Sequence, residues 1–188
     1  MGGWFMVASW KYEPVPSPWG EIAVVWRVGG EEGRAKVAAI ILPGEKNGPE
    51  GVWKRRFPGI VRENSPAIRL FCADIQHALK GQAVRFSLDL LDMASKTDFE
   101  KKVLAACFQI PRGAVLSYGE LAGRVGSPRG ARAVGRVMAG NPFPIVIPCH
   151  RVVRGDGTLG GYGGGLAMKK VLLAWEGIQV PAPRGRSQ

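Results

Sequence analysis

The chain has 188 residues, 46% hydrophobic and 22% charged, which is enough apolar material for one large domain or two small ones. No apolar run is long enough to span a membrane, and the first ten residues lack the features of a secretory signal, so we expect a soluble cytoplasmic protein without membrane contact. The three cysteines, Cys72, Cys107 and Cys149, are too widely spaced for a disulfide framework or a CxxC metal site. With only two histidines in the chain, we expect no bound metal.

The formal net charge of +11 is concentrated in the second half of the chain. Residues 1–92 carry 12 Lys and Arg against 10 Asp and Glu, a net of +2, whereas residues 93–188 carry 14 against 5, a net of +9. Between Arg112 and Arg154 there are seven arginines and a single acidic residue, Glu120. This asymmetry favours a polyanionic partner, above all nucleic acid, over the alternative of a merely solubilising surface.

The first half has the pattern of a small α/β domain. Segments rich in β-branched and aromatic residues predict strands at Trp4–Trp10, Glu21–Val28 and Arg34–Leu42, and turn clusters over 14–20 and 29–33 separate them. A loop is expected over 46–56. Ser65-Pro66 is typical of a helix start and Gly81 of a stop, which predicts a helix over 66–79. The alternation of Val84–Leu91 predicts another half-buried strand.

The second half is predicted to be mainly helical. Asp98 is a candidate cap for a helix over 99–109, and the capping box Ser117-Tyr-Gly-Glu120 opens a short helix to Arg124. After a turn at Gly126, Ser127-Pro128 opens a third helix to Ala139, which completes a helix-turn-helix pattern. A last helix over 167–176 stops at Gly177, and residues 179–188 are expected to form a loose tail.

The third of these helices has the pattern of a nucleic-acid-binding helix. Arg129, Arg132 and Arg136 are spaced to share one face, and Ala131, Val134 and Met138 can pack inward from another. Gly130, Ala131, Ala133 and Gly135 are small enough to allow close approach to a groove, although each glycine costs about 1 kcal/mol of helix stability. The alternative is close packing against another helix, and the charge asymmetry favours DNA.

The segment around Cys149 is the strongest candidate for chemistry. A β-branched run leads to a cysteine held between Pro148 and His150. A thiolate is the nucleophilic form of cysteine, and a nearby base or cation is expected to lower its pKa. His150 could take the proton, directly or through a water, and Glu176 could orient the imidazole. The alternative is a small buried hydrophobic residue, the expectation for Cys72 and Cys107, and His77 is expected to be structural.

A glycine-rich segment over 155–165 follows the cysteine. It is no dinucleotide fingerprint, because it lacks the strand, helix and ribose-binding acid of that motif. It is interpreted as a pocket wall closing over a flat ligand, or else as a flexible connector.

Residues 141–152, NPFPIVIPCHRV, resemble the active-site signature of the O6-alkylguanine-DNA alkyltransferases, also called methylated-DNA–protein-cysteine methyltransferases. The resemblance extends over about residues 97–178. Further matching blocks are Ser117-Tyr118, residues 131–135 (ARAVG), Gly140-Asn141-Pro142, Gly161-Tyr162 and residues 172–177 (LLAWEG). Before residue 93 the match is confined mainly to residues 17–22, SPWGEI.

The resemblance implies a fold and an activity. The fold would be an α/β, ribonuclease-H-like N-terminal domain over 1–92 and a mainly α, winged-helix or helix-turn-helix domain over 93–178. The activity would be stoichiometric, irreversible transfer of an alkyl group from O6-alkylguanine in double-stranded DNA to the protein, with O4-alkylthymine as a second candidate substrate. The target base would be flipped out of the helix. No cofactor is implied, and a monomer is expected, in the cytoplasm near the nucleoid or in a eukaryotic nucleus.

The resemblance also implies roles for individual residues. Cys149 would accept the alkyl group, and His150, a water and Glu176 would activate it. Asn141 would brace the helix-turn-helix against the active segment, and Tyr118 would donate a proton toward guanine N3. The implied DNA contacts come from Arg132, which replaces the extruded base, and from Arg129, Arg136, Ala131, Ala133, Gly135 and Ser117. The implied pocket residues are Tyr162, Gly163, Met138 and Val152, together with carbonyl groups near Cys149.

The sequence departs from the family at two points. Some members have Ser where this chain has Gly163, which is expected to widen the pocket, and some have a zinc site in the N-terminal domain whose ligands are missing here. Three alternatives remain. A non-catalytic lesion-binding protein would lack the reactive cysteine, a helix-turn-helix regulator would not explain Pro148-Cys149-His150, and a cysteine hydrolase would need an oxyanion hole and repeated turnover.

Overall fold

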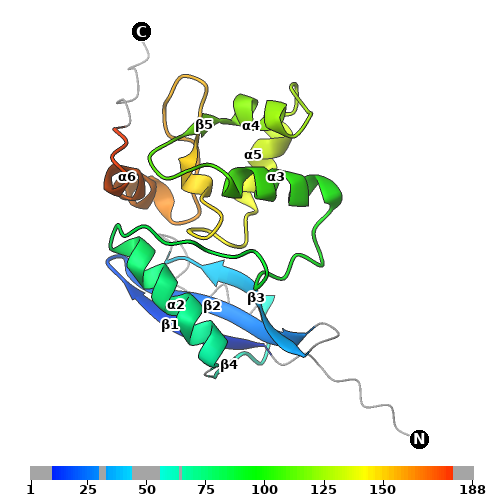
Figure 1. The fold of residues 1–188 in the computed structure, drawn as a ribbon, viewed down its shortest axis with the longest axis vertical. Helices are drawn as coiled ribbons and strands as arrows, with labels where there is room; N and C mark the ends of the chain where they lie inside the picture. The colour runs from blue at the N-terminus through cyan, green and yellow to red at the C-terminus, as the bar shows by residue number, and fades with distance from the viewer. Residues whose placement is uncertain (1–9, 30–32, 44–55, 64, 180–188) are drawn as a thin grey trace, which may run out of the picture.

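The computed structural model of the chain describes residues 10–29, 33–43, 56–63 and 65–179, arranged as a sheet-and-helix unit and a helical unit (Figure 1). The predicted strand over 4–10, loop over 46–56 and tail over 179–188 lie outside these ranges except for one residue each. Within the described ranges no helix is both long enough and apolar enough to cross a membrane.

A four-stranded sheet forms the N-terminal unit, in the order β3-β2-β1-β4. Its strands are β1 (Lys11–Ser17), β2 (Gly20–Gly29), β3 (Arg34–Ile41) and β4 (Val61–Arg62). Strand β2 is antiparallel to both of its neighbours, and β4 runs parallel to the start of β1. Strands β2 and β3 confirm the predictions over 21–28 and 34–42.

Strand β1 includes Pro14 and Pro16, in a stretch that was predicted to be a turn. In the described part of the chain, β4 pairs only with Lys11 and Tyr12, so β1 has a neighbour on one side only from Pro14 onwards. Residues two apart in a strand direct their N–H groups to the same edge, and an unpaired edge tolerates the N–H that proline lacks. The prolines therefore belong to an edge strand, and the turn that follows is confined to residues 18–19.

Helix α2 (Pro66–Leu79) lies across one face of the sheet, as Figure 1 shows, and its bounds confirm the predicted 66–79. Its buried residues, Ile68, Phe71, Cys72, Ile75 and Leu79, have the spacing of one helical face. Alternate residues of β2 serve two cores: Ile22, Val24 and Trp26 share a cluster with α2, whereas Ala23 and Val25 pack with Phe57 on the opposite face.

The segment after α2 crosses to the helical unit without forming the predicted strand over 84–91. Its β contact in the described structure is a single bridge between Val37 and Leu91. Val37 N–H donates to the Leu90 carbonyl and Asp92 N–H donates to the Val37 carbonyl, each at 2.7 Å. The alternation that suggested a strand is present as partial burial against the core. Alternating burial shows that one side of the segment packs against the core. A strand also needs a neighbouring strand to hydrogen-bond with, and this segment lacks one in the described structure.

The C-terminal unit contains the helices α3 (Asp98–Phe108), α4 (Tyr118–Arg124), α5 (Ala131–Ala139) and α6 (Gly165–Trp175). A 3-10 turn, η1 (Cys149–Arg151), lies between α5 and α6. Two short parallel strands, β5 (Leu116–Ser117) and β6 (Val152–Val153), join the start of α4 to the end of η1. This strand pair was not predicted, because two residues are too few to show a periodicity.

Side-chain caps determine where α3 and α4 begin. The Ser117 hydroxyl accepts from Glu120 N–H at 3.1 Å and the Glu120 carboxylate accepts from Ser117 N–H at 2.6 Å, which confirms the predicted capping box. Helix α3 has the same arrangement between Thr97 and Glu100, so Thr97 and not Asp98 is its cap. Asp98 is instead the first helical residue, where its negative charge favours the helix N-terminus.

Helix α5 begins at Ala131, later than the predicted start at Pro128. Gly130 N–H donates to the Ser127 carbonyl at 2.7 Å and closes a turn before the helix. A Cβ at Gly130 would lie 2.9 Å from that carbonyl, so the turn requires glycine. Arg129 belongs to this turn, and the prediction that it shares a helical face with Arg132 and Arg136 was wrong.

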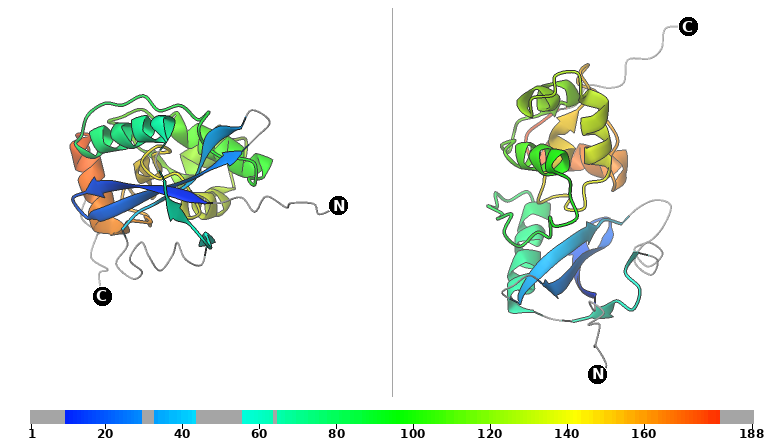
Figure 2. Two further views of the ribbon diagram at one scale, coloured as in Figure 1. Left: turned by 90° about the horizontal axis from the view of Figure 1, so that it is seen from below. Right: turned by 90° about the vertical axis from the view of Figure 1, so that its right-hand side faces the viewer.

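The two units share one hydrophobic core, and Figure 2 shows the segment after α2 running between them. Ile40 N–H in β3 donates to the Pro142 carbonyl at 2.7 Å. The ring of Trp19 packs against that of Trp175, with centroids 5.5 Å apart. The hydrogen bond holds β3 beside the segment that leads to Cys149, and the ring contact joins the turn between β1 and β2 to the end of α6.

Candidate active site

Cys149 lies at the start of η1 and is 7% exposed. The β-branched run before it forms a turn. The Asn141 side chain braces this turn: Nδ2 donates to the Ile147 carbonyl and Oδ1 accepts from Phe143 N–H, each at 3.0 Å. Ile145 has a φ of 75°, which costs a β-branched residue about 1–3 kcal/mol. Asn141 therefore helps to hold a strained turn that fixes the position of Cys149.

The structure brings His150 and Glu176 together, with Nε2 of the histidine 3.1 Å from Oε1 of the glutamate. A carboxylate only accepts, so Nε2 carries the proton and Nδ1 presents a lone pair. Arg151 donates to both Glu176 oxygens, from Nε at 2.9 Å and from Nη2 at 2.8 Å. The remaining Arg151 nitrogen, Nη1, donates to the Ile110 carbonyl at 2.6 Å, so the guanidinium anchors the carboxylate to the end of α3.

Burial controls the ionisation of this site. It raises the pKa of Cys149, although a hydrogen bond with Asn141 and the charge of Lys169 act in the opposite direction. It lowers the pKa of His150, and contact with Glu176 offsets this only in part. Burial also disfavours the charged form of Glu176, but hydrogen bonds from His150 and Arg151 outweigh it and lower the pKa to about 2. The resting site thus holds a thiol, a neutral imidazole and a carboxylate. The expectation of a lowered cysteine pKa was wrong for this resting state.

A cavity of about 310 Å³ lies beside Cys149, between the two units. From the C-terminal unit it is lined by Met138, Asn141 and Gly163, and from the N-terminal unit by residues 39–42, at the end of β3. Met138 and Gly163 were predicted to line a pocket. The contribution of β3 was not predicted, because it depends on how the two units pack.

Three other predicted residues, Tyr118, Tyr162 and Val152, are not in the lining of this cavity. The ring of Tyr118 packs against Gly160, where an added Cβ would lie 2.4 Å from the phenol oxygen, and burial raises the pKa of Tyr118. Tyr162 stands edge-on to His150, with ring centroids 6.3 Å apart. Its hydroxyl is buried and has no hydrogen-bond partner in the described structure. Val152 is buried in β6.

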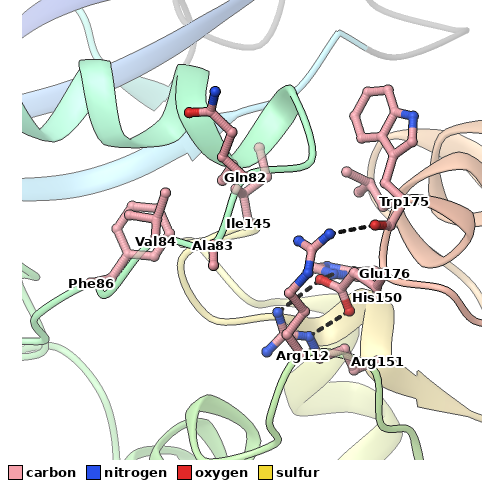
Figure 3. A pocket seen from close by; sticks show the side chains of 12 residues that line it. Gln82, Ala83, Val84, Phe86, Arg112, Ile145, His150, Arg151, Trp175 and Glu176 are labelled. Atoms are coloured by element: carbon pink, nitrogen blue, oxygen red, sulfur yellow. Dashed lines mark hydrogen bonds and ion pairs between the residues drawn. The ribbon is translucent and has the colours of Figure 1, made fainter.

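A second cavity, of about 140 Å³, lies between the units and is lined in part by His150 and Glu176 (Figure 3). Arg112 donates to the Trp175 carbonyl there and so fixes the end of α6 directly before Glu176. From the N-terminal unit the cavity is lined by Ala78, Gln82, Ala83, Val84 and Phe86. The backbone beside Glu176 is thus held by Arg112, while its carboxylate is held by His150 and Arg151.

Sequence reasoning missed Lys169, which is fully buried in α6. Its Nζ donates to the Val152 carbonyl at 2.6 Å and to the Gly160 carbonyl at 3.3 Å. Burial lowers the pKa of Lys169 to about 8, although nearby Cys149 raises it. A signal was available, because Lys169 falls within the apolar stripe of α6 beside Met168, Leu172 and Leu173. Arg151 was quoted in the motif but was given no role.

The predicted DNA-contact residues lie on or next to α4 and α5. Arg129, Arg132 and Arg136 are exposed, and Ala131, Ala133 and Gly135 are partly covered. A Cβ at Gly135 would meet only Tyr118 Cδ1, at 3.9 Å, so internal packing does not require a glycine there. The Ser117 hydroxyl serves as the cap of α4. In the described residues, no group of three or more His, Cys, Asp or Glu side chains could hold a metal ion.

Comparison with known proteins places this geometry in a family. Residues 98–178 match the family model described as 6-O-methylguanine DNA methyltransferase, DNA binding domain. A methylated-DNA–protein-cysteine methyltransferase of Methanothermobacter thermautotrophicus is 42% identical over 163 residues, which cover 85% of this chain and 81% of that protein.

Solved structures are similar over nearly the whole chain. The crystal structure of Mycobacterium tuberculosis O6-methylguanine methyltransferase has a TM-score of 0.70 at 29% identity, covering 92% of this chain and 96% of that one. Mycobacterium tuberculosis OGT in complex with DNA has a TM-score of 0.68 at 30% identity, covering 88% and 92%. With identity of this level over most of both chains, the protein belongs to the methylated-DNA–protein-cysteine methyltransferase family.

Proposed function

We propose that the chain repairs DNA directly, by irreversible transfer of an alkyl group from O6-alkylguanine to Cys149. The observation that carries this proposal is the position of Cys149 in the wall of the cavity, next in sequence to a histidine that is hydrogen-bonded to a buried carboxylate. The substrate is alkylated double-stranded DNA, and O4-alkylthymine is a second candidate lesion. One protein molecule repairs one lesion, without a cofactor and as a monomer.

The proton of Cys149 passes to His150 during the reaction. Nδ1 of His150 is buried and has no protein hydrogen-bond partner in the described structure, which suits a water that bridges it to the thiol. Glu176 stabilises the imidazolium that forms, and Arg151 holds Glu176 in place. Because the resting groups are a neutral thiol and a neutral imidazole, the thiolate forms only when the proton moves.

The transfer conserves atoms and charge. The S–C bond to Cys149 forms as the bond from the alkyl carbon to guanine O6 breaks. Guanine leaves as an anion and takes a proton at N3 from Tyr118, which burial keeps protonated. The imidazolium proton then restores the phenol through solvent, so the products are a thioether and neutral guanine. The thioether is stable, which limits each protein to one turnover.

The flipped base occupies the cavity beside Cys149. Carbonyl groups near Cys149 and Val152 accept from the exocyclic amine of guanine, and the backbone at Gly163 faces O6. Met138 and Tyr162 border the base. Asn141 couples this pocket to the helix-turn-helix through its contact with the Ile147 carbonyl.

Helix α5 enters the minor groove of the DNA, with Arg132 in the space left by the extruded base. Arg129, Arg136 and Ser117 contact the backbone. Ala131, Ala133 and Gly135 allow close approach, and the open space around a Cβ at Gly135 supports this over packing within the protein. The related Mycobacterium tuberculosis OGT was crystallised in complex with DNA, which also supports DNA as the partner.

We assign the described units to two domains, 1–92 and 93–178, the first ribonuclease-H-like and the second winged-helix-like. Support for the first is its sheet, in which an antiparallel β3-β2-β1 meander is followed by β4 parallel to β1. Support for the second is the α4–α5 pair joined by a short turn.

Intact mass after incubation with a duplex that contains O6-methylguanine tests the proposal, with Cys149→Ala as the control. We expect one added methyl group per protein, mapped to Cys149 and absent from the control. An unchanged mass with tight binding of the lesion duplex would instead indicate a lesion-binding protein. Sustained ester hydrolysis would indicate a cysteine hydrolase.

A further inference from the structure

Arg56 is a charged residue in the wall of the cavity beside Cys149, and the proposed transfer of a methyl group does not use it. It comes from the N-terminal unit and is exposed to solvent. Among the described residues that line the cavity, no other is charged at rest and none is acidic. The rest of this lining is apolar apart from Cys149 and Asn141, and the Asn141 amide already holds the backbone turn. A single positive group thus borders an otherwise uncharged cavity.

An aromatic ring, and not an acid, holds the guanidinium of Arg56. Its Cζ atom lies 5.3 Å from the centroid of the Phe57 ring, within the range of a cation–π contact. Phe57 is buried in the smaller core with Ala39 and Ile41 of β3, which also line the cavity. In the part of the chain that the structure describes, the Arg56 side chain makes no hydrogen bond or ion pair, so its N–H donors are available.

A guanidinium with available donors matches a carboxylate, which it binds through two parallel hydrogen bonds. Arg56 shares its cavity with Cys149, which favours the alkyl group of the lesion over a backbone phosphate as its partner. In O6-carboxymethylguanine a carboxylate is attached directly to the carbon that the Cys149 sulfur must reach. Without a nearby cation, placing this carboxylate among apolar side chains would be unfavourable.

We propose that Arg56 selects lesions whose alkyl group carries a carboxylate, with O6-carboxymethylguanine as the simplest member of the class. This inference rests on the proposed function and names a further substrate class for the same cavity. The bond from the CH2 carbon to guanine O6 breaks as the bond from this carbon to the Cys149 sulfur forms. The proton of the thiol leaves through His150 and guanine gains one at N3, as in methyl transfer. The carboxylate stays paired with Arg56, and the protein product is S-carboxymethylcysteine.

The test compares single-turnover rates for two duplexes of the same sequence. One carries O6-carboxymethylguanine, and the other carries O6-carbamoylmethylguanine, which is neutral and has nearly the same shape. The ratio of the two rates is measured for wild type, Arg56→Met and Arg56→Lys. Loss of the charge is expected to lower the ratio by about fivefold, the effect of an exposed charged pair. Arg56→Lys keeps the charge but not the planar fork, and it is expected to recover part of the ratio.

Arg62→Met is the matched control, because Arg62 is an exposed arginine of the same described range that is not in the lining of the cavity. Its ratio is expected to equal that of wild type. An unchanged ratio in Arg56→Met would show that Arg56 does not recognise the adduct. Rates that fall equally for both duplexes would indicate a contact with a DNA phosphate, and the inference would again be wrong. If wild type transfers no group even from O6-methylguanine, the proposed function fails instead.

Discussion

Cys72 in the N-terminal unit and Cys149 in the C-terminal unit are equally buried, each 7% exposed, but their surroundings differ. Burial raises the pKa of Cys72 to about 12, and the negative charge of Glu13 acts in the same direction. Burial also raises the pKa of Cys149, but Asn141 and Lys169 oppose it there. Burial makes both residues thiols at rest, and in the proposed reaction the polar neighbours of Cys149 are what distinguish it from Cys72.

The largest expected effect comes from replacing each of these two cysteines in turn and comparing the rates of methyl transfer. Cys149→Ser should reduce methyl transfer by at least on the order of 10⁴-fold, because a hydroxyl loses its proton far less readily than a thiol. Cys72→Ala should leave the rate unchanged and lower stability only through lost packing. Single-turnover assays on the lesion duplex check both. Methyl transfer in Cys149→Ser that maps to Cys72 would show that the two cysteines do not differ in their ability to accept the methyl group.

A second prediction concerns the support of Tyr118. In Gly160→Ala the new Cβ would lie 2.4 Å from the Tyr118 hydroxyl, so the ring must move. A displacement of about 1 Å can cost on the order of 100-fold in rate, and we expect a loss of transfer approaching that size. Gly155→Ala, in the same glycine-rich segment, is the control, since no atom lies within 4 Å of a Cβ at that position. Equal rates for both variants would mean that the Tyr118 position is unimportant.

A third prediction uses the carboxylate of Glu176, which His150 and Arg151 hold by hydrogen bonds. The pKa of Glu176 is lowered from 4.5 to about 2 in the folded protein, so its stabilising contribution is present above pH 4.5 and is lost as pH falls toward 2. The contribution is about 3 kcal/mol. Urea unfolding of wild type and Glu176→Gln should differ by roughly this amount at pH 6, and the difference should shrink in acid. A difference that does not change between pH 6 and pH 3 would contradict the assigned ion pairs.

The smallest expected effect is at Gly163, in the cavity wall opposite β3. No atom lies within 4 Å of a Cβ at this position, so Gly163→Ser should change stability by less than about 0.5 kcal/mol. The added side chain should narrow the cavity and slow benzyl transfer relative to methyl transfer by a few-fold. The ratio of the two rates measures this. A lower melting temperature with an unchanged ratio would show that the residue serves the fold and not the pocket.

Local signals in the sequence predicted local structure well. The capping box at Ser117 and the proline start of α2 depend on residues within one helical turn, so both are confirmed. At the start of α3 both Thr97 and Asp98 are residue types that cap helices. Thr97 is the cap because Glu100, three residues later, completes a capping box with it. Pro14 and Pro16 led to the incorrect prediction of a turn. A strand accepts prolines at these positions only because β4 ends before them, and the local sequence does not show where β4 ends.

The site was predictable only in part. The Cys149-His150 pair and Glu176 were identified from a motif, and the structure places them together. The β3 wall was missed because it depends on packing between segments that lie far apart in the sequence. The burial of Lys169 was missed although its place in the apolar stripe of α6 was a local signal. The ionisation of Cys149 was also missed, since burial of the sulfur cannot be read from neighbouring residues alone.

The end of β3 lines the cavity beside Cys149, although the family model that matches this chain covers only residues 98–178. The range of lesions that fit the cavity would then depend on two parts of the chain, the end of β3 and residues 98–178, whose sequences can vary separately. Chimeras that join the C-terminal unit of this chain to the N-terminal units of different relatives would keep the same reacting groups and change which alkyl groups fit the cavity. Residues 39–42 are therefore a place to redesign selectivity without touching a reacting group.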